Sequence, residues 1–406
     1  MTDHMQVVIV GGGLAGWRTA EELRAAGFAG KLTIVCEENY PPYDRPPLSK
    51  RLLKTDVDPA PEVLERSGST AESLEIDLRC GVAARALRPG AVVTECGEQL
   101  RYDALVIATG VRARTLPALS GHPRAHLLRT FDDAMALRSA MATARSLLVI
   151  GAGFIGAEVA TAARDRGLEV TIVEALKVPY ERSLGPLVGG IVGRMANRYG
   201  VALLTGRGVH AVDDDTDAVT VRLTDGSCRS ADIAVVGIGS KVDTEWLAGA
   251  RPAGCWATGI TCDGAGRVQG MATAFGHVYA LGDVASWQDD PEVGPVRFEH
   301  WNTAVEQAPI VARGLMRDLA GAHRERTRPL LPYFWSDQYG RRVQLLGRPR
   351  LANRVELLHG EEPADPQAPP PRKLLAGYYA GHSLVAVAAI SAPALLMRYR
   401  QLLENN

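Results

Sequence analysis

Short apolar runs, glycine turns and helical stretches alternate along the first two thirds of the chain. The runs Val7–Val10 and Leu147–Ile150 each lead into a Gly-x-Gly-x-x-Gly turn, and a helical pattern follows each turn. A second apolar run comes after each helix, at Leu32–Val35 and Val170–Val173. This order of strand, turn, helix and strand is typical of β-α-β units that bind a dinucleotide. The pattern predicts an α/β fold with two Rossmann-like units.

The two glycine turns, Gly11–Gly16 and Gly151–Gly156, place glycine where such a unit needs it. The first glycine permits the tight turn, the next lets the backbone approach a pyrophosphate, and the last lets helix and strand pack closely. An acid follows each second strand, Glu37 in one copy and Glu174 in the other, where a ribose would be bound. Glycine clusters that serve packing alone are the alternative, disfavoured because both copies meet every condition. The glycines concerned are Gly11, Gly13, Gly16, Gly151, Gly153 and Gly156.

Composition narrows the class of protein. The 406 residues suffice for two or three domains, and the net charge of −1 argues against binding nucleic acid through bulk positive charge. No apolar run reaches the roughly 18 residues of a membrane span, and the N-terminus lacks the basic flank of a secretory signal. The six cysteines show neither metal-ligand nor redox-pair spacing, so we expect no metal site. A cytoplasmic enzyme is therefore expected.

Three more apolar strands are predicted, at Tyr102–Gly110, Ala231–Gly239 and His277–Leu281. The first two end in small-residue turns and are expected to return the chain beside a glycine turn. The third runs into Gly282 and Asp283. A carboxylate at the C-terminal end of a strand lies at the crevice where open α/β sheets bind ligands. Asp283 is thus a candidate to bind a polyol chain, with a helix cap or turn as the alternative.

Longer motifs resemble those of FAD-dependent NADH:ferredoxin reductases, the family that includes putidaredoxin and rhodocoxin reductases and the reductase components of ring dioxygenases. The resemblance covers nearly the whole chain and implies FAD at the first glycine turn and NADH at the second. The motifs that carry it are Tyr43–Lys50 (YDRPPLSK), Ala108–Gly110 (ATG), Leu128–Thr130 (LRT), Val278–Asp283 (VYALGD), Glu299–Gln307 (EHWNTAVEQ) and Phe334–Gln338 (FWSDQ).

The resemblance also implies cofactor contacts. Trp301 takes the position whose backbone N–H meets the flavin pyrimidine edge, and a helix N-terminus aimed there would stabilise the charge of reduced flavin. Thr303 and Glu306 have capping-box spacing, which predicts a helix that begins just after Trp301. The implied FAD contacts are Gly11, Gly13, Leu14, Ala15, Gly16, Glu37, Arg45, Lys50, Val82, Ala108, Thr109, Gly110, Arg129, Gly282, Asp283 and Trp301. The implied NAD contacts are Gly151, Gly153, Phe154, Ile155, Gly156, Glu158, Glu174 and Gly237.

Lys50 and Glu158 are the implied catalytic pair, because they resemble a family ion pair beside flavin N5. A buried ammonium needs a charged partner, since desolvation alone would remove its proton. The alternative is a surface lysine and a helix glutamate that never meet. Glu174 would accept a hydrogen bond from a ribose 2′-hydroxyl and repel a 2′-phosphate, which favours NADH over NADPH.

The implied reaction is hydride transfer from NADH to FAD, followed by two single-electron transfers to a [2Fe–2S] ferredoxin. That ferredoxin would serve a haem monooxygenase or a ring dioxygenase. Related flavoproteins that reduce disulfides carry a cysteine beside the flavin, and Tyr43–Lys50 contains none. Two alternatives stay open: an NADH oxidase or quinone-type reductase, and a redox-sensing protein that binds FAD and NAD.

Three domains are expected. Residues 1–114 and 245–327 would form a discontinuous FAD-binding domain, 115–244 an NAD-binding domain, and 328–406 a C-terminal α+β domain. Residues 323–354 carry eight arginines against two acids. Such a face would steer an acidic ferredoxin, and a solvated arginine face is the alternative.

Overall fold

The computed structural model describes residues 4–54, 58–213, 216–250, 256–290, 294–322, 330–361 and 368–405. Its contacts divide the chain into two compact units, which are described separately below. Unit 1 contains residues 1–44, 61–112 and 241–330, and unit 2 contains residues 45–60, 113–240 and 331–406. Strands β8 (Val111–Ala113) and β17 (Ser240–Val242) form where the chain passes from one unit to the other.

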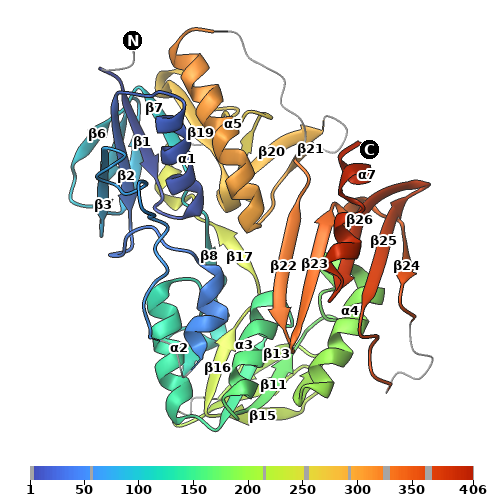
Figure 1. Cartoon of the computed structure of the whole chain (residues 1–406). Helices are drawn as coiled ribbons and strands as arrows, with labels where there is room; N and C mark the ends of the chain where they lie inside the picture. The colour runs from blue at the N-terminus through green and yellow to red at the C-terminus, as the bar shows by residue number, and fades with distance from the viewer. Residues whose placement is uncertain are drawn as a thin grey trace. The chain divides into compact units, whose positions relative to one another are not determined.

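Unit 1 contains a five-stranded parallel sheet. In spatial order its strands are β19 (His277–Ala280), β7 (Ala104–Ile107), β1 (Gln6–Val10), β2 (Lys31–Cys36) and β3 (Ile76–Cys80). Helices α1 (Leu14–Ala25) and α5 (Trp301–Leu319) pack against each other beside this sheet (Figure 1). The predicted order of strand, turn, helix and strand is thereby confirmed for the first glycine turn.

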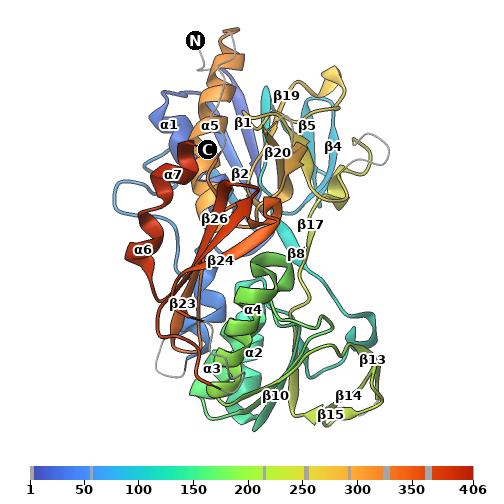
Figure 2. The ribbon, with the colours of Figure 1, turned by 90° about the vertical axis from the view of Figure 1, so that its right-hand side faces the viewer.

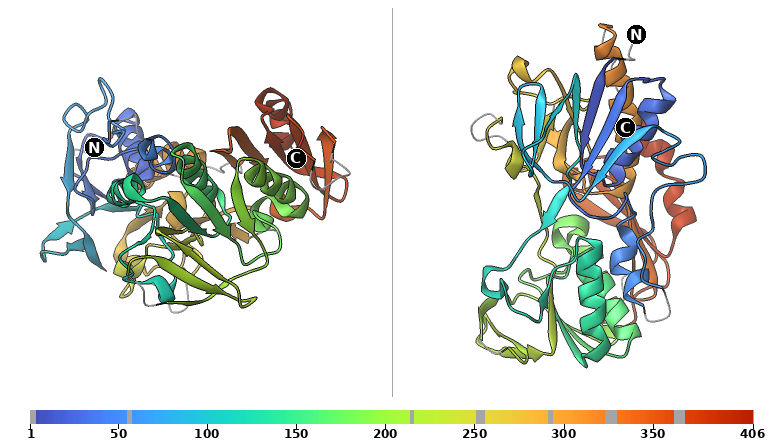
Figure 3. Two further views of the ribbon diagram at one scale, coloured as in Figure 1. Left: turned by 90° about the horizontal axis from the view of Figure 1, so that it is seen from below. Right: turned by 90° about the vertical axis from the view of Figure 1, so that its left-hand side faces the viewer.

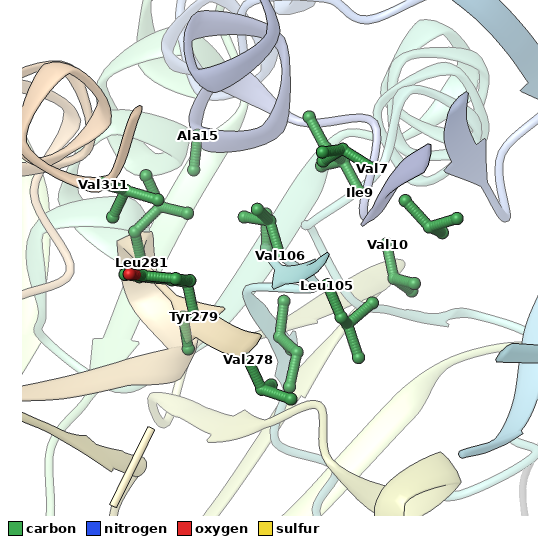
Figure 4. Close-up of a cluster of buried hydrophobic side chains, with 14 of the residues drawn as sticks. Val7, Ile9, Val10, Ala15, Leu105, Val106, Val278, Tyr279, Leu281 and Val311 are labelled. Carbon is green, nitrogen blue, oxygen red and sulfur yellow. The ribbon is translucent and has the colours of Figure 1, made fainter. Parts of the chain in front are cut away.

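Smaller sheets lie on the other side of this parallel sheet, as two further views show (Figures 2 and 3). One consists of β4 (Ala84–Arg88), β5 (Ala91–Thr94) and β6 (Gln99–Arg101), and the other of β18 (Ile260–Cys262), β20 (Ala285–Asp290) and β21 (Gly294–Val296). Because both faces are covered, the central strands are apolar along their length. Figure 4 shows the resulting core, in which Val7, Ile9, Val106, Tyr279 and Leu281 are all buried.

The start of α5 agrees with the prediction to within one residue, but its cap does not. The helix begins at Trp301 with His300 as N-cap, and no side chain caps it. Thr303 lies within the first turn and is buried, so its hydroxyl is one turn too late to act as the cap. The capping box predicted from Thr303 and Glu306 is therefore wrong.

Unit 2 contains a second five-stranded parallel sheet. In spatial order its strands are β12 (Val201–Leu204), β11 (Glu169–Val173), β10 (Ser146–Ile150), β16 (Ile233–Val236) and β9 (Ala125–His126). Helices α2 (Phe131–Thr143), α3 (Phe154–Asp165) and α4 (Glu181–Arg198) lie on one side and strands β13 (Val209–Val212), β14 (Val219–Leu223) and β15 (Cys228–Ala231) on the other (Figure 2). The side chains of β10 therefore point alternately to the two sides of the sheet. Leu147 and Val149 share a core with α3, and Leu148 and Ile150 share a core with β14.

The C-terminal part of unit 2 is a five-stranded antiparallel sheet. In spatial order its strands are β22 (Tyr333–Gln338), β23 (Arg341–Gly347), β26 (Ser383–Ile390), β25 (Leu374–Ala380) and β24 (Arg354–His359). One face shares a core with α4, through residues such as Leu345 and Tyr378, and the other packs on the short helices α6 (Pro393–Met397) and α7 (Arg400–Asn405). Two dinucleotide-type sheets and a C-terminal α+β part confirm the predicted fold class.

The contacts place residues 45–60 and the C-terminal sheet in the same unit as the second dinucleotide-type sheet. The three-domain division therefore stays a prediction. Among the described residues, no helix is long and apolar enough to cross a membrane.

Candidate active site

The first glycine turn, in unit 1, has the geometry of a phosphate cradle. Gly11 has φ +118°, and a Cβ there would overlap the Ala108 carbonyl. A Cβ on Gly16 would overlap the Gly11 carbonyl, so α1 approaches the turn as closely as glycine permits. A Cβ on Gly13 would meet nothing within 4 Å. The turn is thus crowded on its protein side and open where α1 begins, where a pyrophosphate would bind to free N–H groups.

The end of β19 lies against this turn. A Cβ on Gly282, which has φ +72°, would be 2.9 Å from the Ala15 side chain, and the Gly282 N–H donates to Gln307 Oε1 at 2.8 Å. The predicted candidates Gly282 and Asp283 are therefore next to the first residues of α1. At the start of α5, the Trp301 indole N–H donates to Asp44 Oδ1 at 2.7 Å. This bond fixes the side chain of Trp301. The backbone N–H of the same residue is the predicted flavin contact.

Glu37 has a partner that the sequence did not point to. Arg112 lies 2.6 Å from Glu37 Oε2 and 3.1 Å from Asp243 Oδ2. Burial raises the pKa of Asp243, and Arg112 opposes that rise. The Thr109 hydroxyl donates to the Asp243 carbonyl at 2.7 Å. Arg112 therefore orients Glu37, the predicted ribose-binding acid. In the sequence, the only hint of this role is that Arg112 comes just after the Ala108–Gly110 turn.

Val82 and the cysteines nearest the first turn also have defined places. The Val82 N–H donates to the Cys36 carbonyl at 2.8 Å. The backbone group of Val82 left to contact FAD is therefore its own carbonyl oxygen. Cys36 and Cys80 are neighbours in the register of β2 and β3. The Cys36 sulfur occupies the space that a Cβ on Gly12 would need. No cysteine among the described residues forms a disulfide, and Cys36 is buried beneath the turn.

The second glycine turn, in unit 2, repeats the first. Gly151 has φ +105°, and a Cβ there would overlap the Gly237 carbonyl; a Cβ on Gly153 would meet nothing within 4 Å. No side chain caps α3, and its first turn holds no acid. Glu174 accepts from the Ala152 N–H at 2.7 Å and from the Leu176 N–H at 2.8 Å. Its carboxylate is thus bonded to the turn itself.

Lys50 and Glu158 meet, so the prediction that they form a pair agrees with the structure of unit 2. The Lys50 ammonium lies 2.9 Å from Glu158 Oε2, and the side chains are 24% and 3% exposed. The pair has two further partners that the sequence did not reveal: the hydroxyls of Ser49 and Ser336 both donate to the Glu158 carboxylate. Their separations in the chain, 109 and 178 residues, explain why no local pattern indicated them.

Aromatic side chains lie at the start of α3. The Phe154 ring is 5.1 Å from the Tyr180 ring and 4.3 Å from the Phe334 ring, measured between centroids. The Tyr180 hydroxyl donates to Gln338 Oε1 at 2.5 Å, and burial raises the tyrosine pKa well above its ordinary value. Ile155, the next residue of the turn, is 46% exposed. Phe154 is therefore packed against two aromatic rings, whereas Ile155 is exposed.

Arg45 and Arg129 are brought together in unit 2, where the Arg45 guanidinium donates to the Arg129 carbonyl at 2.6 Å. Arg129 leads into α2, whose N-cap Thr130 forms a true capping box with Asp133. The structure therefore groups the predicted contacts by unit. Unit 1 holds those at the first turn, the Ala108–Gly110 turn, Glu37, Val82, Asp283 and Trp301, and unit 2 holds Arg45, Lys50, Arg129 and the contacts predicted for NAD. Their roles toward the cofactors stay predictions.

Two phosphate cradles and a lysine–glutamate pair with a buried carboxylate are features of an oxidoreductase that uses two dinucleotides. Residues 5–308 match the family model described as pyridine nucleotide-disulphide oxidoreductase, and residues 333–406 match the one described as reductase C-terminal. The chain belongs to this family, within the branch of ferredoxin reductases.

Individual relatives agree with that assignment. The chain is 37% identical to rhodocoxin reductase of Rhodococcus erythropolis over 84% of this chain and 78% of that protein. It is 34% identical to the ferredoxin–NAD(+) reductase component of the p-cumate 2,3-dioxygenase system of Pseudomonas putida, over 89% of this chain and 86% of that protein. The crystal structure of a covalent putidaredoxin reductase–putidaredoxin complex matches with a TM-score of 0.86 and 28% identity, covering 99% of this chain and 94% of that chain.

Proposed function

We propose that this protein carries electrons from NADH through FAD to a [2Fe–2S] ferredoxin, one electron at a time, and that the ferredoxin serves an oxygenase. The observation that carries the proposal is the repeated cradle, in which Gly13 and Gly153 each face open space at the start of an uncapped helix. One cradle fits the pyrophosphate of FAD and the other that of NADH.

The residues present fit both cofactors. The bound FAD would supply a group that can take up a hydride from NADH and give up electrons one at a time. In unit 1, Glu37 held by Arg112 would bind the adenosine ribose, and Asp283 the ribityl chain. In unit 2, Glu174 would bind the NADH ribose, and the Lys50 ammonium would lie beside the reacting edge of the flavin, held there by Glu158.

A protein acceptor is favoured over a disulfide for two reasons. The Tyr43–Lys50 segment contains no cysteine. Cys262 is wholly buried in unit 1, and burial raises the pKa of its thiol well above the ordinary value, which disfavours the thiolate. The relatives at 34–37% identity are a rhodocoxin reductase and a ferredoxin–NAD(+) reductase component of a dioxygenase system.

The test is an anaerobic titration of the purified protein with NADH and with NADPH, followed by flavin absorbance. We expect bleaching by one equivalent of NADH. Reduction of cytochrome c is then compared with and without an added [2Fe–2S] ferredoxin, and we expect it to depend on the ferredoxin. Rapid oxidation of NADH by oxygen or a quinone alone would instead indicate an oxidase or quinone reductase, and tight NADH binding without turnover would indicate a redox sensor.

Two further expectations belong to this proposal. The cytoplasmic location predicted from the sequence is tested by cell fractionation. In the arginine-rich segment 323–354, residues 323–329 lie outside the described residues. Arg342 pairs with Asp337 at 2.7 Å and Arg354 pairs with Glu356, so part of the positive charge is already compensated. Electrostatic steering requires turnover with the ferredoxin to fall as salt rises, and a flat salt dependence would contradict it.

A further inference from the structure

Strand β22 contacts the second dinucleotide-type part of unit 2 through every other residue. Phe334 packs on Phe154, Ser336 bonds to Glu158, and Gln338 bonds to Tyr180. Residues two apart in a strand share a face, and residues four apart in a helix do as well, so one face of β22 meets Phe154 and Glu158 on one face of α3. Figure 1 shows β22 beside α3. The C-terminal segment thereby reaches the residue that pairs with Lys50.

The Glu158 carboxylate is enclosed by donors from three distant parts of the chain. Its Oε2 accepts from Lys50 and Ser49, and its Oε1 accepts from Ser336 at 2.5 Å. Ser49 is 2% exposed and Ser336 is 0% exposed, so water does not replace either hydroxyl. A buried carboxylate is tolerated only when hydrogen bonds and a charge partner satisfy it.

We propose that Ser336 and Ser49 are positioning residues of the hydride-transfer site. Resting on the proposed function, the inference is that the two hydroxyls hold the Glu158 carboxylate in the one orientation that keeps the Lys50 ammonium in place. Lys50 is 24% exposed and its other acceptor, the Pro46 carbonyl, lies at 3.4 Å, so Glu158 is the partner that fixes it. The C-terminal strand would therefore act on the site through the bond from Ser336 to Glu158.

The first test is a double-mutant cycle on the holoprotein, with urea unfolding as the readout. Ser336→Ala removes a hydrogen bond to a charged group, so the unfolding equilibrium constant should rise about tenfold. In the Glu158→Ala background the same substitution should change it less than about threefold, because the partner is already gone. Ser286→Ala is the matched control, since Ser286 is also buried and its hydroxyl donates to the Thr258 carbonyl at 3.3 Å and not to Glu158. Ser286→Ala should change the unfolding equilibrium constant by the same factor with and without the Glu158→Ala substitution.

The second test separates positioning from packing. In Ser336→Ala the limiting rate of flavin reduction by NADH should fall about tenfold, the NADH dissociation constant should stay within about twofold, and the flavin midpoint potential should become more negative because the ammonium is less well fixed. Ser286→Ala should change none of the three.

Equal effects of Ser336→Ala with and without the Glu158 side chain, or an unchanged midpoint potential, would overturn the inference. Failure of the proposed function looks different. The unsubstituted protein would then bind FAD without being reduced by NADH, while the unfolding cycle would still decide whether Ser336 acts through Glu158.

Discussion

Gly151 and Gly153, two glycines of one turn, should respond differently to alanine: one substitution should lower the stability and the other should weaken NADH binding. At Gly151 the backbone has φ +105°, a conformation that costs a side-chain-bearing residue about 1–3 kcal/mol. The new Cβ would also lie 2.8 Å from the Gly237 carbonyl carbon and closer still to its oxygen, an overlap that costs about 1–3 kcal/mol. Gly151→Ala should therefore lower the free energy of unfolding by about 2–6 kcal/mol.

Gly153 differs because its backbone, with φ −85° and ψ −178°, suits any residue and its Cβ would meet nothing within 4 Å. Gly153→Ala should cost less than about 1 kcal/mol in stability, the difference between glycine and alanine as N-cap. Its methyl group would instead occupy the space assigned to the NADH pyrophosphate. We expect NADH binding at least about tenfold weaker, the equivalent of 1.4 kcal/mol, with FAD retained.

Urea unfolding by circular dichroism gives the first quantity, and a titration of flavin absorbance with NADH gives the second. The reasoning is refuted if Gly151→Ala unfolds at the same urea concentration as the unsubstituted protein. It is equally refuted if Gly153→Ala binds NADH normally, because the open space would then not be the phosphate site.

Three other predictions follow from single contacts. Glu158→Ala leaves the Lys50 ammonium without its charge partner, so it should lower the free energy of unfolding by about 3 kcal/mol. It should also slow flavin reduction in a stopped-flow experiment, and an unchanged rate would remove Glu158 from the site. Glu174→Gln removes the charge that repels a 2′-phosphate. The ratio of kcat/KM for NADH to that for NADPH should therefore fall about tenfold or more, the equivalent of 1.4 kcal/mol. A constant ratio would mean that other residues set the preference for NADH. Burial lowers the pKa of His126, against the opposing effect of Asp133. The unfolded chain therefore binds the proton first, so the stability contributed by neutral His126 is complete above about pH 6.5 and is lost as the pH falls toward the lowered pKa. His126→Asn should flatten that part of a stability–pH curve, and an unaltered curve would contradict the assignment.

Agreement between sequence and structure is best where the signal is local. The strand predicted at Val7–Val10 is β1, Gln6–Val10, and the one at Leu147–Ile150 is β10, Ser146–Ile150. Glycine was predicted to be needed at Gly11 and Gly151, and both have backbone conformations that other residues rarely adopt. Such features depend on residues within one turn or strand, so a short stretch of sequence contains their cause.

Agreement is poorer where a feature depends on how a segment is packed. The spacing of Thr303 and Glu306 matched a capping box, but the N-cap of α5 is His300, three residues before Thr303, and Thr303 is buried within the first turn. The spacing that did form a capping box, Thr130 and Asp133, lies beside the predicted flavin contact Arg129. Local pattern alone does not distinguish a cap from an interior turn when tertiary burial selects between them.

By itself the sequence determined the two β-α-β units and the acids after their second strands, because periodicity and glycine spacing express local steric and hydrophobic preferences. The candidates Lys50 and Glu158 came from the resemblance to a known family. Only the tertiary structure decided that Arg112 pairs with Glu37 in unit 1, and that Ser49 and Ser336 bond to Glu158 in unit 2. It also decided that residues 46–53 and strand β22 contact α3. Hydrogen bonds between residues more than a hundred positions apart are set by which faces pack together, and that choice belongs to the whole chain.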